Sequence, residues 1–170
     1  MRSSRCQENL WVLVLSSVLL LARVASSQSE NRGTSRALSR DFATSALTAA
    51  AQIRDWEMHL AYTLKNGYPL SEYWIAADRD QAADALELAV SAAKRKADRA
   101  ALMQLANLFG IVQSWSDARL EDKRNLRLAN YYVSASALDN DELFQNAVSC
   151  TSSLIAMLAS AKLTEETTCR

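Results

Sequence analysis

The chain has 170 residues, with 19 basic and 19 acidic side chains and one histidine. The charges are balanced and do not form the basic stripe of a nucleic-acid-binding protein, so we expect no nucleic-acid partner. Three glycines and one proline are too few to separate the short strands of a β-sheet fold. We therefore predict an all-α protein, an antiparallel bundle of four to five long helices.

Residues 1–27 have the layout of a secretory signal peptide. Arg2 and Arg5 precede the apolar run Leu10–Ala22, small residues follow it, and cleavage is expected before Ser27 or Gln28. The run is shorter than the roughly 20 residues that cross a bilayer, which makes an uncleaved membrane anchor the less favoured alternative. We expect a secreted, extracellular protein with no stable membrane span after cleavage.

Removing the leader leaves about 143 residues with 16 basic and 18 acidic side chains, enough for one domain with its own core. We predict a flexible lead-in at residues 28–35, a helical bundle domain at 36–163 and a C-terminal tail at 164–170.

The first helix is predicted from apolar side chains that recur at steps of three and four residues. These are Leu38, Phe42, Ala46, Ala49, Ile53, Trp56, Leu60 and Leu64. Gly67 and Pro69 are expected to end this helix. Ser71 then serves as the N-cap of a second helix.

The second helix is expected to bury Ile75, Ala82, Leu86, Ala89 or Val90, and Ala93. Two interpretations of the next boundary stay open: Asp98 caps a third helix, or the helix continues without a break. The third stripe comprises Leu102, Leu105, Leu108 or Phe109, Val112 and Trp115. The pattern is interrupted around Ser116-Asp117, which predicts a kink or a short loop there.

The last helix is expected to begin after Asp139, which would cap it, with Glu142 three residues on. Its apolar stripe is Leu143, Ala147, Cys150, Leu154, Leu158 and Ala161.

Cys150 and Cys169 are the two cysteines that remain after the leader, and with it Cys6, is removed. From Cys150 the helix rises ~20 Å up to Leu163, and six extended residues cover ~20 Å on the way back. A disulfide between Cys150 and Cys169 is therefore feasible and predicted. The alternative is that Cys150 is a small buried apolar residue.

The sequence contains no recognisable catalytic, cofactor-binding or metal-binding motif, so we predict a non-enzyme with no cofactor and no metal. His59 is the only histidine, and its spacing of two from Glu57 places the pair on different helix faces. An enzyme that uses isolated carboxylates remains an open alternative.

Aromatic residues divide into predicted core and predicted contact residues. Trp56 and Trp115 lie on apolar stripes and are assigned to the core. Tyr73, Trp74 and Tyr131 are predicted contacts with a partner, because aromatic residues are enriched at binding hot spots. Of these, Trp74 and one adjacent tyrosine are expected to be exposed.

Three segments have a pattern in common with a known family. Asp78-Arg79 precedes Ala82, Asp84, Ala85 and Leu86; Ser116, Ala118 and Leu120 lead to Lys123-Arg124; and the last helix runs from Asn146-Ala147 to Leu158. Together they resemble the plant invertase and pectin methylesterase inhibitor family. That resemblance implies a secreted four-helix bundle that blocks a cell-wall enzyme by binding it. The family's usual cysteines and N-terminal hairpin are missing here, so no enzyme-contacting residue is carried over.

A second, shorter similarity lies at Arg36-Ala37-Leu38-Ser39, which is close to the Arg-x-Leu-Arg element of oomycete host-directed effectors. We therefore predict a secreted, non-enzymatic helical bundle that binds another protein, with inhibition of a cell-wall enzyme implied by the first resemblance. The alternatives are a host-directed effector of a pathogen and an extracellular carrier of small molecules or lipids.

Overall fold

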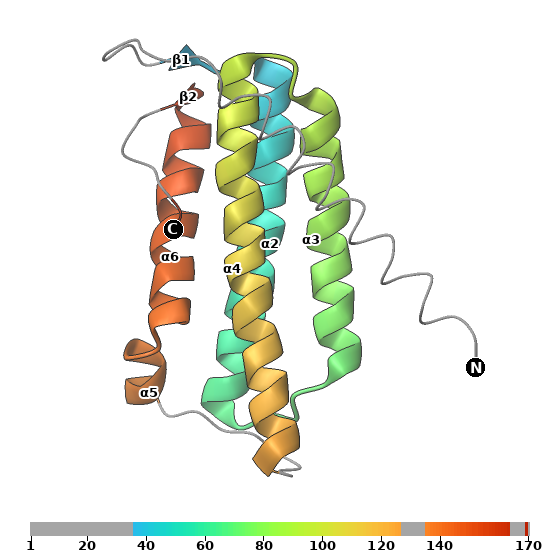
Figure 1. Cartoon of the computed structure of the whole chain (residues 1–170), viewed down its shortest axis with the longest axis vertical. Coiled ribbons are helices and arrows are strands. Elements are labelled where there is room, and N and C mark those ends of the chain that lie inside the picture. The colour runs from blue at the N-terminus through green and yellow to red at the C-terminus, as the bar shows by residue number, and fades with distance from the viewer. Residues whose placement is uncertain (1–35, 127–134, 164–168, 170) are drawn as a thin grey trace, which may run out of the picture. The chain divides into compact units, whose positions relative to one another are not determined.

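The computed structural model describes residues 36–126, 135–163 and 169, and these form a bundle of α-helices (Figure 1). The helices are α2 (Arg40–Asn66), α3 (Glu72–Ala92), α4 (Lys96–Leu126), the short α5 (Ala135–Asp139) and α6 (Glu142–Ala159). Two-residue strands, β1 (Arg36–Ala37) and β2 (Lys162–Leu163), pair antiparallel. The predicted all-α bundle is confirmed, with four long helices and one short helix.

The predicted signal peptide (1–27) and lead-in (28–35) lie outside the described residues, as does the tail except for Cys169. Across the ranges that are described, no helix combines the length and the apolar character needed to cross a membrane.

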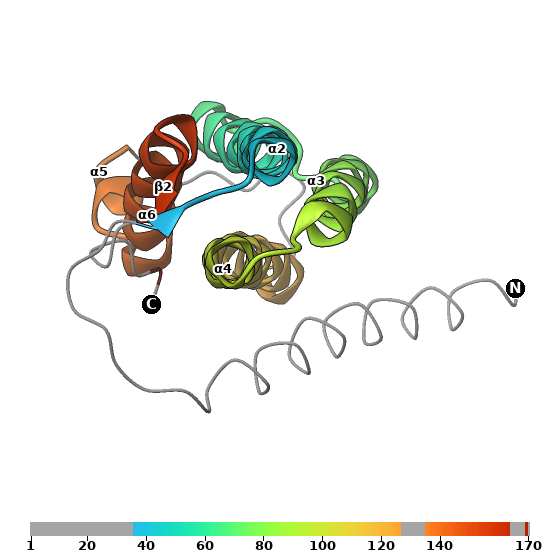
Figure 2. The ribbon, with the colours of Figure 1, turned by 90° about the horizontal axis from the view of Figure 1, so that it is seen from above.

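Seen from above, α2 lies between α3 and α6, and α4 closes the bundle on the opposite side (Figure 2). Successive long helices run in opposite directions. Large, fully buried side chains fill the centre from α2, α4 and α6, and include Phe42, Ile53, Trp56, Leu105, Trp115 and Leu154. Withdrawing each of these large side chains from water contributes about 1.5–3 kcal/mol. Helix α3 contributes the fully buried alanines Ala82 and Ala89.

Helix α2 buries one continuous apolar stripe, as its spacing predicts. All eight predicted residues, from Leu38 to Leu64, are buried, although Leu38 precedes the first residue of α2 and is not helical. Gly67 ends the helix with φ 66°, a left-handed conformation that glycine adopts without steric cost. The N–H groups of Gly67 and Tyr68 donate to the carbonyls of Leu64 and Thr63, which satisfies carbonyl groups left free at the helix end.

The boundaries of α3 and α4 agree with the prediction only in part. The Ser71 hydroxyl caps α3 by accepting the Tyr73 N–H at 3.2 Å, as predicted. A break at residues 93–95 separates α3 from α4, so the alternative of an uninterrupted helix was wrong. Asp98 is not the cap itself but lies in the first turn of α4, where its carboxylate accepts the Arg95 N–H at 3.0 Å.

Helix α4 runs without interruption through Ser116-Asp117, so the predicted short loop was wrong. The physical reason is that Ser116 is fully buried and occupies a place on the buried face between Trp115 and Leu120. A small polar side chain thus fills a core position, and the apolar pattern looks broken although the helix is not.

The start of α6 also differs from the prediction. Asp141, not Asp139, is the N-cap, and its Oδ1 accepts the N–H groups of Leu143 and Phe144 at 3.1 and 3.2 Å. Asp139 is instead the last residue of α5. Ala147, Cys150, Leu154 and Leu158 are buried as predicted. Leu143 is 39% exposed, because it lies in the first turn of α6, next to the cap.

The two ends of the described bundle are fastened to each other. Arg36 pairs with Leu163 across β1 and β2, and the Leu38 N–H donates to the carbonyl of Ala161 at 2.9 Å. Ala161 has φ 52° and lies beyond α6, so its predicted place on the helical stripe was wrong.

Asp98 adds a second attachment at the same end. Its carboxylate accepts the backbone N–H of Ser39 at 2.9 Å and the Ser39 hydroxyl at 2.8 Å. Leu38 is buried beside it. The segment that is close to an effector element therefore has a structural role in this fold.

Candidate functional site

Four large side chains are exposed toward the end of the bundle where α2 stops and α3 begins, the lower end in Figure 1. Met58, Tyr62, Tyr68 and Tyr73 are 52%, 58%, 50% and 86% exposed. We call these four residues the aromatic end. Met58 and Tyr62 are four residues apart on α2 and therefore lie on one face. A grouped set of exposed apolar side chains, unlike a single one, is typical of an interaction surface.

Tyr62 and Tyr68 are neighbours within the aromatic end. Their ring centroids are 5.8 Å apart, with the planes tilted by 41°. A hydrogen bond with Tyr68 is the largest cause that raises the pKa of Tyr62 above its ordinary value of 10.0. The Tyr62 phenol is therefore neutral at physiological pH, and it offers a hydroxyl group beside an exposed ring face.

His59, Trp74 and Asp78 form a contact between α2 and α3 beside the aromatic end. The His59 Nδ1 lies 2.7 Å from Asp78 Oδ2, and its ring stacks on Trp74 with centroids 4.2 Å apart. Within the described part of the chain, no serine, threonine or cysteine hydroxyl or thiol hydrogen-bonds to His59. The arrangement holds the ends of α2 and α3 together.

The predicted contact residues differ in their surroundings. Tyr73 is exposed, as expected. Trp74 was expected to be exposed but is partly buried, because it packs against a core cluster formed by α2, α3, α4 and α5, and its ring stacks on His59. Tyr131 lies outside the described residues. Trp56 and Trp115 are buried, which confirms their assignment to the core.

A pocket of about 320 Å³ opens beside Tyr62, between α2, α5 and α6. It is lined by Met58, Ala61, Tyr62 and Lys65 from α2, Leu138 and Asp139 from α5, and Phe144 from α6. Most of the lining is apolar. Leu138 lies at its base, since it is only 4% exposed and belongs to the core cluster that Phe144 also contacts.

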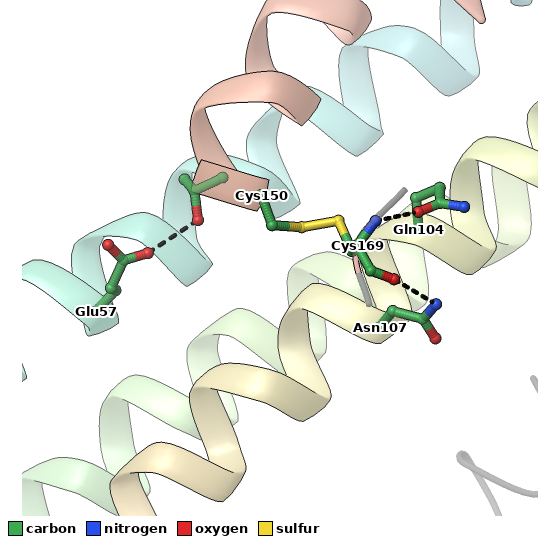
Figure 3. The surroundings of a disulfide bond; sticks show 6 residues. Glu57, Gln104, Asn107, Cys150 and Cys169 are labelled. Atoms are coloured by element: carbon green, nitrogen blue, oxygen red, sulfur yellow. Dashed lines mark hydrogen bonds between the residues drawn. A yellow bond between two sulfur atoms is a disulfide. The ribbon is translucent and has the colours of Figure 1, made fainter. Parts of the chain in front are cut away.

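Cys150 and Cys169 are joined by a disulfide, with Cα atoms 5.3 Å apart (Figure 3). Both residues are buried. The backbone N–H of Cys169 donates to Gln104 Oε1 at 2.8 Å, and its carbonyl accepts from Asn107 Nδ2 at 3.4 Å. One tail residue therefore links α6, through its sulfur, to α4, through its backbone. Gln104 and Asn107 were not predicted as contact residues, because their only signal in the sequence is a spacing of three on one helix face.

Glu57 is a buried acid close to this disulfide (Figure 3). Its Oε2 accepts the Thr151 hydroxyl at 2.8 Å, and Thr151 follows Cys150 on α6. Burial raises the pKa of Glu57 above its ordinary value of 4.5, against smaller opposite effects of the Thr151 bond and the charge of Arg54. A signal existed in the sequence, because Glu57 continues the buried spacing of Ile53, Leu60 and Leu64.

Replacing Glu57 with glutamine is expected to raise the free energy of unfolding at pH 7 by about 1 kcal/mol. The folded-state pKa is raised, so the stabilising contribution of the protonated acid is complete below the unfolded pKa near 4.5 and is lost as pH rises through the folded value. Glutamine keeps an acceptor for Thr151 and carries no charge. Urea unfolding at pH 3.5 and pH 7 measures the difference.

The gain should vanish near pH 3.5, where both side chains are neutral. Glu87→Gln on the exposed face of α3 is the matched control and should change stability little at either pH. An equal gain at both pH values would contradict the assignment of the effect to a buried charge.

The ranges that the structure describes contain no group of three or more histidine, cysteine, aspartate or glutamate residues placed to hold a metal ion. No protein-family model matches the sequence, and neither a curated protein nor a solved structure is significantly similar to it.

Proposed function

We propose that the protein is a secreted, non-enzymatic helical bundle that binds another protein through the aromatic end. The observation that carries this proposal is the exposure of Met58, Tyr62, Tyr68 and Tyr73 toward one end of the bundle. Met58 and Tyr62 also line an apolar pocket. Large aromatic side chains contribute much of the binding energy at protein interfaces. Tyrosine and methionine also bind with adaptable geometry, because one has a polar hydroxyl and the other a flexible side chain.

The narrower form of the proposal is inhibition of a cell-wall enzyme. Two features support it: the resemblance of three helical segments to the invertase and pectin methylesterase inhibitor family, and the leader at residues 1–27. In that form the aromatic end covers the active site of the enzyme and excludes its substrate.

The test uses the purified protein with a purified cell-wall invertase and, separately, a pectin methylesterase. A 1:1 complex in size-exclusion chromatography and loss of the enzyme's activity are expected with one of the two. The double variant Tyr62→Asp/Tyr73→Asp should weaken binding by roughly 100-fold or more, since hot-spot truncations cost about 2 kcal/mol or more each. Circular dichroism confirms that the variant remains helical.

Leu88→Asp is the matched control, because Leu88 is 64% exposed on α3 and lies outside the aromatic end. It should bind as the wild type does. If neither enzyme binds, the inhibitor form is refuted. If a partner binds the double variant and the wild type equally, the aromatic end is not the binding surface.

The pocket favours carriage of a small apolar molecule as a second candidate function. Its volume of about 320 Å³ lies at the small end of the ~300–1,000 Å³ range of ligand sites. Native mass spectrometry of the protein, purified from the medium into which its source cells secrete it, should then show a bound small molecule. A spectrum of the unliganded mass alone would count against this function.

A further inference from the structure

Two opposite charges stand at the pocket, and neither has a partner within the part of the chain that is described. Lys65 and Asp139 are both exposed, they come from α2 and α5, and no hydrogen bond or ion pair with a described residue engages either. Lys65 lies in the last turn of α2, where a positive charge suits the helix dipole. Asp139 is the last residue of α5, where a negative charge gains nothing from the helix.

The remainder of the lining suits a hydrocarbon chain and a soft cation. Met58, Leu138 and Phe144 present apolar atoms to the interior. Tyr62 adds an aromatic ring close to the charged residues, and such rings attract quaternary ammonium groups. An apolar interior with one positive and one negative group complements a molecule that has a single chain and a zwitterionic head.

We propose that this pocket binds a small zwitterionic amphiphile of the alkylphosphocholine type. The alkyl chain enters between α2 and α6, the phosphate contacts Lys65, and the trimethylammonium group lies against Asp139 and the ring of Tyr62. The proposal goes beyond protein binding, since it needs no protein partner and depends on Lys65 and Asp139 rather than on Tyr73. It rests on the second candidate function, the carriage of a small molecule in this pocket, and specifies its ligand.

The probe is n-dodecylphosphocholine below its critical micelle concentration, titrated calorimetrically into the full chain. Wild type should bind it 1:1. Lys65→Glu and Asp139→Lys should each weaken binding by about fivefold, the size of one exposed charge contact. The affinity of the double variant Lys65→Glu/Asp139→Lys should recover to within about twofold of wild type. The headgroup can reorient so that its phosphate contacts residue 139 and its trimethylammonium group contacts residue 65.

Controls separate the headgroup from the chain. Lys162→Glu reverses an exposed lysine in β2, at the other end of the bundle, and should leave binding unchanged. Ala61→Phe fills the pocket from α2 without touching a charge and should abolish binding. Phosphocholine without a chain should bind far more weakly than the amphiphile.

Three outcomes would overturn the proposal. If the wild type does not bind the amphiphile, the proposed site does not exist. If the wild type, both single variants and the double variant bind it equally, the pocket is apolar and does not select the headgroup. Tighter binding of dodecanoate to Asp139→Lys, without recovery of dodecylphosphocholine binding in the double variant, identifies an anion site instead. None of these results bears on the Tyr62/Tyr73 test, so failure of one proposal is distinguishable from failure of the other.

Discussion

Replacing Trp115 with alanine is expected to lower the free energy of unfolding by about 4 kcal/mol, a large share of the stability of a small domain. Trp115 is fully buried, and its ring centroid lies 4.9 Å from that of Phe144 on α6. Its Nε1–H donates to Asp141 Oδ2 at 2.9 Å, so the same carboxylate caps α6 and fixes the tryptophan. Truncation leaves a cavity and removes a donor from Asp141. Urea unfolding followed by circular dichroism measures the loss.

A pair of phenylalanine variants isolates the hydrogen bond from the packing. Trp56 is buried to the same extent, but its Nε1 has no hydrogen-bond partner among the described residues. Trp115→Phe should therefore cost about 1 kcal/mol more than Trp56→Phe. Equal costs would contradict a stabilising role for the bond to Asp141.

Removing the disulfide with Cys150→Ala/Cys169→Ala is expected to lower the free energy of unfolding by about 3 kcal/mol. The two cysteines are 19 residues apart, and the bond restricts the unfolded chain over that loop. The variant also weakens the hold of Cys169 on Gln104 and Asn107, because an unlinked tail gains conformational freedom. Thermal unfolding of the oxidised wild type and the variant measures the difference.

Two comparisons make this result interpretable. Reduced wild type should match the double variant, and Asn107→Ala should cost at most about 1 kcal/mol, since it removes one long hydrogen bond. If the variant were as stable as the oxidised wild type, the tail would not contribute to the stability of the bundle.

The helices were predictable because their information is local. The stripe from Leu38 to Leu64, the stop at Gly67 and the cap at Ser71 depend on side chains within a few residues of each other. The disulfide was predictable for a similar reason: only two cysteines lie beyond the predicted leader, and the geometry of one helix and one short tail limits their separation.

The predictions were wrong where a polar side chain has a role that its residue type and neighbours do not indicate. Ser116 is polar yet buried, so it was mistaken for an interruption of α4. Asp139 and Asp141 both suit an N-cap, and only the existence of the short α5 decides between them. Asp98 was placed at a helix start correctly but given the role of the cap itself.

The candidate site could not be assembled from the sequence, because its residues meet only across helices. His59 and Trp74 come from α2 and α3, and their stacking removes Trp74 from the surface where it was expected. Tyr62 faces Leu138 and Phe144 across more than 70 residues of chain. Of this surface, only the exposure of Tyr73 followed from local pattern.

The pairing of Arg36 with Leu163 has a consequence for how the bundle can be handled and displayed. Both strands lie at one pole of the molecule, and α2 travels away from them for 27 residues, about 40 Å, before Tyr68 is reached. A tether joined to the bundle at Arg36 therefore attaches it at the end opposite the exposed tyrosines. Such attachment leaves the exposed Tyr68 and Tyr73 away from the support. Immobilised protein therefore presents its aromatic end to the solution without further engineering.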